Sequence, residues 1–124
     1  MKVLLSIKPE FANMIFSGTK QFEFRKVLFR RSNITTIIVY SSFPVQRVIG
    51  EFSVEAIFSD SPKAIWEKTH SMAGITKKYF FSYFEKHNKA VAIKIGCAKR
   101  YRTAKSLSDF SLSNAPQSFV YIEE

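Results

Sequence analysis

Three charged residues, Lys20, Glu23 and Arg25, lie close together in the stretch "GTKQFEFRK", which begins at Gly18. A lysine can hold an anionic or base-edge acceptor, and a glutamate can accept from an exocyclic amine or act as a general base. In a strand, Glu23 and Arg25 share one face and Lys20 does not. However, Lys20 comes directly after a turn, so its long stem can reach the same face. These residues form either a solvated ladder of ion pairs or the polar floor of a pocket.

The remaining reactive residue types argue against several other kinds of site. His70, His87 and Cys97 offer no paired spacing of the kind that metal ions need, so we expect no metal site. The glycines are scattered at positions 18, 50, 74 and 96, which excludes glycine-rich phosphate loops of Walker or Rossmann type. We therefore expect no cofactor.

The charge balance favours a polyanionic partner. The chain carries 19 lysine and arginine residues against 10 acidic ones, which gives a net charge of +9. Such an excess attracts phosphates and releases counterions on binding, so RNA or another nucleic acid or nucleotide is the expected partner. Many cations interleave with Tyr101 in the C-terminal half, at Lys77, Lys78, Lys86, Lys89, Lys94, Lys99, Arg100, Arg102 and Lys105. These cations belong either to a binding groove or to a solvated face.

Length and composition indicate a single domain over residues 1–124. The chain is 46% hydrophobic and 15% aromatic, and no Pro/Gly/Ser-rich linker divides it. The one cysteine, Cys97, lies in an apolar run that suits a buried position, and it cannot form an internal disulfide, which fits a reducing cytoplasm. The apolar run in "MKVLLSI" is short, so we read it as a first strand, and expect no membrane span.

The N-terminal half reads as strands around one helix. We expect strands over 3–7, 20–25 and 35–40, and an extended segment over 45–58 that Gly50 bends. Pro9 suits the first turn of a helix that ends at Gly18. Residues 26–33 are expected to form a loop. In the fourth strand, Val48, Phe52, Val54, Ala56 and Phe58 share one parity.

The C-terminal half reads as two short helices followed by strands. Ser61-Pro62 begins one helix, and a second runs from Thr76 to about Lys86. In the strand over 89–101, alternation turns Val91, Ile93, Ile95 and Cys97 to the core, and Ala90, Ala92, Lys94 and Ala98 away. A helical turn begins at Ser106, and a last strand spans 118–122. The fold class is α+β, with five to six mainly antiparallel strands in a small curved sheet or barrel and two to three short helices.

The spacing Gly18-x-Lys20-x-x-Glu23-x-Arg25 resembles the signature of the ASCH domain, a member of the PUA-like superfamily. Neighbouring stretches agree with it: "LLSIKPEFANMIFSG" before the signature, "VYSSFPVQRVIGEF" after it, and the closing "APQSFVYI". The resemblance therefore covers almost the whole chain. It implies a β-barrel with a cleft between barrel and helices, suited to RNA or a modified nucleoside.

The resemblance also implies two possible activities. One branch of the family hydrolyses N(4)-acetylcytidine with a lysine, a threonine and a glutamate. Lys20 matches the lysine, but Glu23 replaces the threonine and Ala73 stands at the glutamate position, so we do not transfer that activity. Metal-assisted RNA cleavage, implied for some members, would need Glu23 together with Glu51 or Glu55.

Our interpretation is a nucleic-acid-binding module, associated with transcription or translation, in which Lys20 and Arg25 hold acceptors and Glu23 determines specificity. The alternatives are a hydrolase on a modified nucleoside or RNA, with Glu23 as general base and Lys20 polarising the substrate, and a protein-interaction module. Tyr40 and Trp66 are candidate stacking surfaces, although Trp66 equally suits a core position. Further binding candidates are Lys8, Ser41, Ser42, Gln117 and Ser118.

Overall fold

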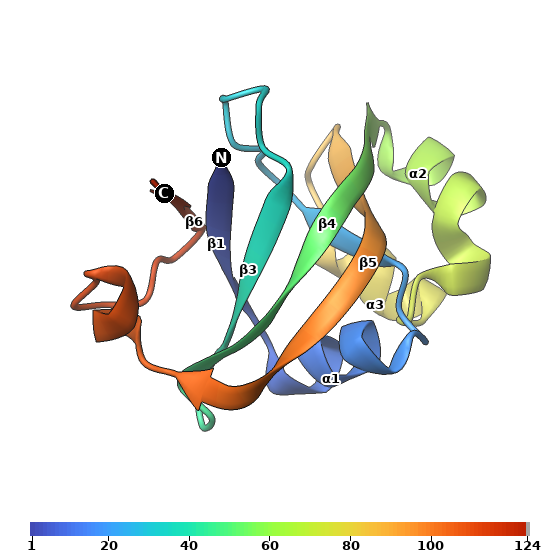
Figure 1. Cartoon of the computed structure of the whole chain (residues 1–124). Helices are drawn as coiled ribbons and strands as arrows, with labels where there is room; N and C mark the ends of the chain where they lie inside the picture. Colours follow the sequence, from blue (N-terminus) through green and yellow to red (C-terminus); the bar gives the residue numbers. More distant parts are fainter. Residues whose placement is uncertain (124) are drawn as a thin grey trace.

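The computed structural model describes residues 1–123, which form a curved six-stranded sheet with three α-helices (Figure 1). The strands are β1 (Lys2–Ile7), β2 (Phe22–Arg25), β3 (Thr36–Ser41), β4 (Arg47–Asp60), β5 (Ala90–Lys105) and β6 (Phe119–Ile122). The helices are α1 (Pro9–Ser17), α2 (Pro62–Thr69) and α3 (Lys77–Tyr83), and 3-10 turns lie at His70–Met72 and Leu107–Phe110.

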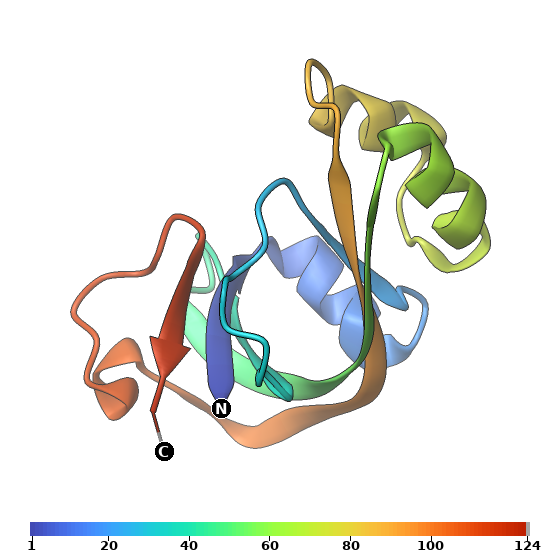
Figure 2. The same ribbon diagram turned by 90° about the horizontal axis from the view of Figure 1, so that it is seen from above.

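The sheet order is β2-β5-β4-β3-β1-β6. β1 and β3 pair in parallel, and the other neighbours pair antiparallel, which confirms the expected mainly antiparallel α+β fold. The sheet curls around α1, as the view from above shows (Figure 2). α2 and α3 lie beyond one side of this curl, and the C-terminal segment lies beyond the other (Figure 1).

Side-chain and glycine caps set the helix ends. Pro9 occupies the first turn of α1, and Gly18 ends this helix at φ 86°, donating its N–H to the carbonyl of Ile15. The Ser61 hydroxyl accepts from the N–H of Ala64 at the start of α2, and Thr76 caps α3 in the same way. These positions confirm the starts that the sequence predicts for α1, α2 and α3.

Bulges in β4 and β5 bend the sheet. The register between β4 and β5 shifts at Val48/Gly50, Phe52/Val54 and Val54/Ala56, and the register between β3 and β4 shifts between Val39 and Tyr40. In the pairing with β3, Ile49 is an extra residue of β4 that turns Val48 and Phe52 to opposite faces, so the single parity predicted for this strand is wrong. Phe52 belongs to the core cluster beneath α1, whereas Val48 packs in a cluster on another face.

Gly50 is needed where α1 crosses the sheet. A Cβ atom at this position would lie 2.5 Å from the Phe16 ring and 2.6 Å from the Lys99 carbonyl oxygen. The absence of a side chain therefore lets α1 approach β4 and β5 closely, in agreement with the expected bend.

Two expectations for β5 are wrong. Ala90 and Ala92 are fully buried, because α2 and α3 cover the face that alternation leaves to solvent, and both pack with Phe24 and Phe80. Cys97 is exposed rather than buried, since it lies beyond the part of β5 that α2 and α3 cover. Among residues 1–123, no helix is both long and apolar enough to cross a membrane.

Candidate functional site

A cavity of about 160 Å³ lies where β2 meets the start of α1 and one face of α3. Its lining contains Ser6, Ile7, Lys8, Phe11, Lys20, Glu23, Phe24, Arg25, Ile75, Tyr79 and Tyr83. Lys20, Glu23 and Arg25 thus meet at one concave site, although strand alternation separates Lys20 from the other two. The chain is not yet in β2 at Lys20, so the lysine stem is free to turn inward.

Lys20 is held at the cavity floor. Its side chain is buried, and Nζ donates a hydrogen bond of 2.8 Å to the carbonyl oxygen of Ala73. The same nitrogen lies 5.3 Å from the ring centroid of Phe11 and 4.8 Å from that of Phe24. Burial lowers the pKa of Lys20 to about 8, and the charge of Glu23 opposes this change. Lys20 therefore loses its proton much closer to neutral pH than an exposed lysine does.

Gly74 fixes the path of the Lys20 stem. This glycine has φ +71°, and a Cβ atom there would lie 2.6 Å from Cβ of Lys20 and 2.7 Å from its Cγ. The turn after α2 can therefore rest directly on the lysine stem only because position 74 has no side chain. The same turn supplies the Ala73 carbonyl that accepts from Nζ.

Glu23 is the buried acid of the site. Its side chain is almost fully buried, and burial raises its pKa, while the positive charges of Lys20 and Arg25 act in the opposite direction. Arg25 Nη1 lies 3.3 Å from Glu23 Oε2 and donates a hydrogen bond to it. The site therefore keeps a carboxyl group ready to accept a hydrogen bond, in a place that water reaches poorly.

Arg25 joins two edges of the curled sheet. It stands at the end of β2, and its Nη2 donates to the carbonyl oxygen of Ser118 at 2.9 Å, just before β6. Its Nη1 donates to the carbonyl oxygen of Ser6 in β1 at 3.4 Å. The sequence predicted that the Arg25 guanidinium binds acceptor groups of a ligand. In the structure it donates to acceptor groups of the protein instead. It orients Glu23 and closes the seam between β2 and β1.

Two tyrosines that sequence reasoning did not propose line the cavity, Tyr79 and Tyr83 of α3. They are one turn apart on one face of the helix, and the pair Phe80 and Phe84 occupies the adjacent, buried face. This double i, i+4 pattern in "YFFSYF" was visible in the sequence. Lys8 Nζ lies 3.2 Å from the Tyr79 hydroxyl, and Lys26 Nζ lies 4.5 Å from the Tyr83 ring centroid.

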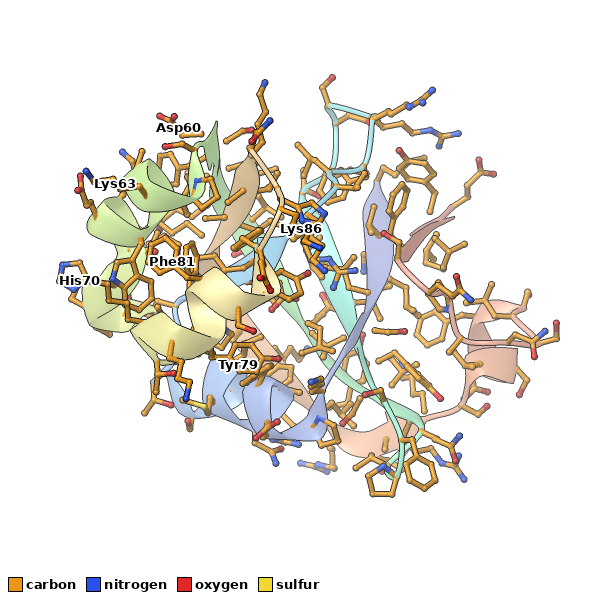
Figure 3. All side chains as sticks on the ribbon, turned by 180° about the vertical axis from the view of Figure 1, so that it is seen from behind. Asp60, Lys63, His70, Tyr79, Phe81 and Lys86 are labelled. Carbon is orange, nitrogen blue, oxygen red and sulfur yellow. The ribbon has the colours of Figure 1, made fainter. Side chains whose placement is uncertain are left out.

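The proposed stacking residues lie away from this cavity. Tyr40 is only 5% exposed and packs with Leu4 and Val48, so it has no free face for a base, and that prediction is wrong. Trp66 packs against Phe80 and Phe81 with centroid distances of 5.0 Å and 6.2 Å, the core position that the sequence also allowed. Figure 3 shows Phe81 between α2 and α3.

The polar candidates outside β2 also lie apart from the cavity lining. Ser41 is buried, Ser42 is half-buried, and Gln117 is exposed. Ser118 contributes its backbone carbonyl to Arg25 and is not part of the cavity lining. Lys8 is the one further candidate that the structure places at the cavity.

Glu51 and Glu55 do not converge with Glu23. Tyr101 donates from its hydroxyl to Glu51 at 2.8 Å, and Lys94 pairs with Glu55 at 2.8 Å. Within residues 1–123, no group of three or more His, Cys, Asp or Glu residues is arranged to hold a metal ion. The carboxylate set needed for metal-assisted cleavage is therefore not assembled in this part of the chain.

The ASCH domain family model matches residues 5–98. The chain belongs to this family. An ASCH domain-containing ribonuclease of Zymomonas mobilis is 33% identical over 91 residues, which cover 73% of this chain and 62% of that protein. The large ribosomal subunit protein uL22 of Ureaplasma parvum is 27% identical over 125 residues. That match covers 98% of this chain, which spans only 39% of the length of this ribosomal relative.

Solved structures agree with the family assignment. The crystal structure of ASCH from Zymomonas mobilis superposes with a TM-score of 0.90 at 28% identity, covering 99% of this chain and 88% of that one. A variant of the same protein with tyrosine changed to phenylalanine gives the same TM-score. The N-terminal domain of Staphylothermus marinus McrB, 12% identical with a TM-score of 0.51, shares the fold alone. It covers 87% of this chain, and this chain covers 77% of it.

Proposed function

We propose that this ASCH domain binds single-stranded RNA and takes one base into the cavity above Lys20 and Glu23. The observation that carries the proposal is the pairing of a buried donor with a buried acceptor at the floor of a cavity with apolar walls. Lys20 and Glu23 are 2% and 6% exposed, and Phe11, Phe24 and Ile75 line the same space. Such concave, largely apolar sites with few polar groups are typical of ligand pockets.

The size of the cavity restricts the ligand. Its volume is about 160 Å³, close to the roughly 150 Å³ of an engineered cavity that holds benzene. The space suits one six-membered ring and leaves no room for the attached sugar and phosphate. A single base that has left its stack meets this restriction, as is usual in sequence-specific recognition of RNA.

Lys20 and Glu23 at the cavity floor select a base whose edge carries a hydrogen-bond acceptor beside a donor. The ammonium of Lys20 has three N–H donors, and the hydrogen bond to Ala73 uses one of them. Glu23 accepts an N–H as a carboxylate, and Arg25 holds it in place. The edges of the bases offer such adjacent groups. A ring without them shields the remaining N–H donors of Lys20 and the remaining acceptor positions of Glu23 from water without giving them partners, and is rejected.

The net charge of +9 supports a nucleic acid as the partner. The relatives named as a ribonuclease and a ribosomal protein support RNA in particular. A place in a transcription or translation complex is a further proposal, and a protein partner would be compatible with it.

A second candidate is hydrolysis of RNA or of a modified nucleoside. Two observations favour it: the Zymomonas relative is named a ribonuclease, and the Lys20 pKa of about 8 lies near neutral pH beside a buried carboxyl group. Glu23 would act as general base toward water and Lys20 would polarise the substrate. Ala73 adjoins Lys20 but supplies only a carbonyl, so the carboxylate of the acetylcytidine-hydrolysing branch has no counterpart at this position.

Binding of labelled single-stranded RNA and of DNA with the same sequence, measured at several salt concentrations, tests the proposal. We expect tighter binding of RNA, loss of at least tenfold in affinity in Lys20→Met and Glu23→Gln, and recovery of intact RNA. Lys63→Met is the control, since Lys63 lies on the outer side of α2 (Figure 3). RNA cleavage that Glu23→Gln abolishes would establish the hydrolase instead. Absence of salt-dependent affinity would contradict both and favour a protein-interaction module.

A further inference from the structure

Two lysine–tyrosine pairs border the cavity, Lys8 with Tyr79 and Lys26 with Tyr83. Lys8 and both tyrosines belong to its lining, and Lys26 lies next to the lining through its contact with Tyr83. Lys8 Nζ lies 5.6 Å from the Tyr79 ring centroid and 3.2 Å from its hydroxyl. Lys26 Nζ lies 4.5 Å from the Tyr83 ring centroid. Both lysines are exposed, and both tyrosines line the cavity. Each pair thus combines a cation in contact with solvent and an aromatic ring at the cavity wall.

The two pairs come from different parts of the fold. Lys8 lies between β1 and α1, whereas Lys26 follows the end of β2. Their tyrosines are four residues apart on α3, which places the Cβ atoms about 5–6 Å from each other. Tyr79 also meets Phe11 edge-on at 5.4 Å, on the Lys20 side of the site. Tyr83 lies on the other side, where the charges of Arg25 and Glu23 act on its hydroxyl.

We propose that these pairs form a clamp for the backbone of single-stranded RNA on both sides of the inserted base. Lys8 and Lys26 hold the two phosphates that flank this nucleotide, and the exposed part of Tyr79 stacks with a neighbouring base. The inference rests on the proposed function, and it specifies the ligand as an internal nucleotide of a strand of at least three residues rather than a free nucleoside.

The small volume of the cavity is the reason why an internal nucleotide of a strand, rather than a free nucleoside, is the expected ligand. With space for one ring, the cavity leaves the ribose and both phosphates outside it, on the side where Lys8 lines the cavity and the exposed Lys26 contacts the lining residue Tyr83. Tyr79 is 37% exposed, so a base can reach its ring. Aromatic rings beside cations are the usual elements of single-strand recognition, with rings for bases and cations for phosphates. A nucleoside alone would leave both lysines without a ligand contact.

A length series tests the clamp: a nucleoside, its 5′-monophosphate, a trinucleotide and a hexanucleotide, each titrated against the wild-type chain. We expect affinity to rise at least tenfold from monophosphate to trinucleotide and little from trinucleotide to hexanucleotide. Equal affinities for nucleoside and trinucleotide would overturn the clamp while leaving the base pocket intact. If none of the four binds, the proposed function itself fails.

Salt dependence separates phosphate contacts from other effects of the lysines. For a single strand, each neutralised phosphate contributes about 0.7 to the slope of log affinity against log salt. We therefore expect Lys8→Ala and Lys26→Ala each to reduce the trinucleotide slope by about 0.7, and the double variant by about 1.4. Lys63→Ala, on the outer side of α2, is the matched control and should leave the slope unchanged. Unchanged slopes in the Lys8 and Lys26 variants would overturn the clamp.

Substitutions of Tyr79 test the stacking contact. Tyr79→Phe keeps the ring and removes the hydroxyl near Lys8, whereas Tyr79→Ala removes both. Loss of one base–aromatic stack corresponds to a loss in affinity of about tenfold. We expect that loss for trinucleotide binding in Tyr79→Ala, little loss in Tyr79→Phe, and a clearly smaller loss of monophosphate binding in Tyr79→Ala, because the ring also lines the cavity. A comparable loss of monophosphate binding in Tyr79→Ala would assign the ring to the cavity wall alone.

Discussion

Lys20 Nζ donates a hydrogen bond of 2.8 Å to the carbonyl oxygen of Ala73, and this contact joins the chain before β2 to the turn after α2. The fold thereby places an ammonium group beneath the helices, where burial lowers its pKa to about 8. A buried amine beside the buried Glu23 is costly to maintain, and such perturbed pairs are frequent at functional sites.

Lys20→Met should change how stability depends on pH. The pKa of Lys20 is about 8 in the folded protein against an ordinary value of 10.5, so between these pH values the unfolded chain binds more protons. The free energy of unfolding of the wild type, relative to Lys20→Met, should therefore rise from pH 8 to pH 10.5, by roughly 3 kcal/mol. Urea titrations across this range measure it. If the difference in free energy of unfolding between the wild type and Lys20→Met does not change with pH, the burial of a charged amine is contradicted.

Glu23→Gln should show the opposite dependence at lower pH. Burial raises the Glu23 pKa above its ordinary value of 4.5, so above pH 4.5 the folded protein binds more protons than the unfolded chain. The stability of the wild type relative to Glu23→Gln should therefore fall as pH rises through the folded-state pKa, then become constant. Urea titrations between pH 4 and pH 8 measure this dependence. A relative stability that rises with pH would show that Lys20 and Arg25 outweigh burial.

Arg25→Ala should destabilise the fold by about 3 kcal/mol, because it removes charge-assisted hydrogen bonds to Ser6 and Ser118 and leaves Glu23 with one positive neighbour fewer. The midpoint of urea unfolding measures this loss. The matched control is Arg102→Ala on β5, where the arginine is exposed. If both arginine variants unfold at the wild-type midpoint, Arg25 does not hold the seam.

Gly74→Ala should reduce RNA affinity, whereas Gly18→Ala should not. Both glycines have positive φ, at +71° and +86°, so each substitution carries a similar backbone cost of about 1–2 kcal/mol. Only at position 74 does the new Cβ meet another residue, at 2.6 Å from Cβ of Lys20, while nothing lies within 4 Å at position 18. Titration of both variants with the same RNA separates displacement of Lys20 from backbone strain. Equal affinities would show that the lysine stem adapts.

Trp66→Ala should destabilise the chain without changing the selectivity of RNA binding. Its ring packs against Phe80 and Phe81 between α2 and α3, and truncation of such a side chain costs about 3–5 kcal/mol. Thermal unfolding measures the loss, and Trp66→Phe should recover part of it. Base preference should remain that of the wild type at temperatures where the variant is folded. A changed preference would return Trp66 to the binding surface.

The three charged residues of the candidate site could be picked out from the amino-acid order, whereas most of the other candidates lie outside the cavity. The spacing of Lys20, Glu23 and Arg25 identified them, and local chemistry predicted the caps Gly18, Ser61 and Thr76, since those signals act within one helical turn. Tyr79 and Tyr83 are spaced i, i+4 and so share one face of α3, but no role for them was predicted from this spacing. The sequence could not predict that Tyr79 and Tyr83 line a cavity, because no local sequence rule places α3 over it.

The tertiary structure alone decided burial and partners. Alternation predicted solvent beside Ala90 and Ala92, but α2 and α3 fold over that face. The sequence allowed Tyr40 a stacking role, but residues of the C-terminal segment pack against it. The bulge of β4 against β3 places Val48 and Phe52 on opposite faces. Burial depends on segments that are far apart in the sequence. The curl of the sheet brings Ser6 and Ser118 to Arg25, and the turn at Ala73 encloses Lys20.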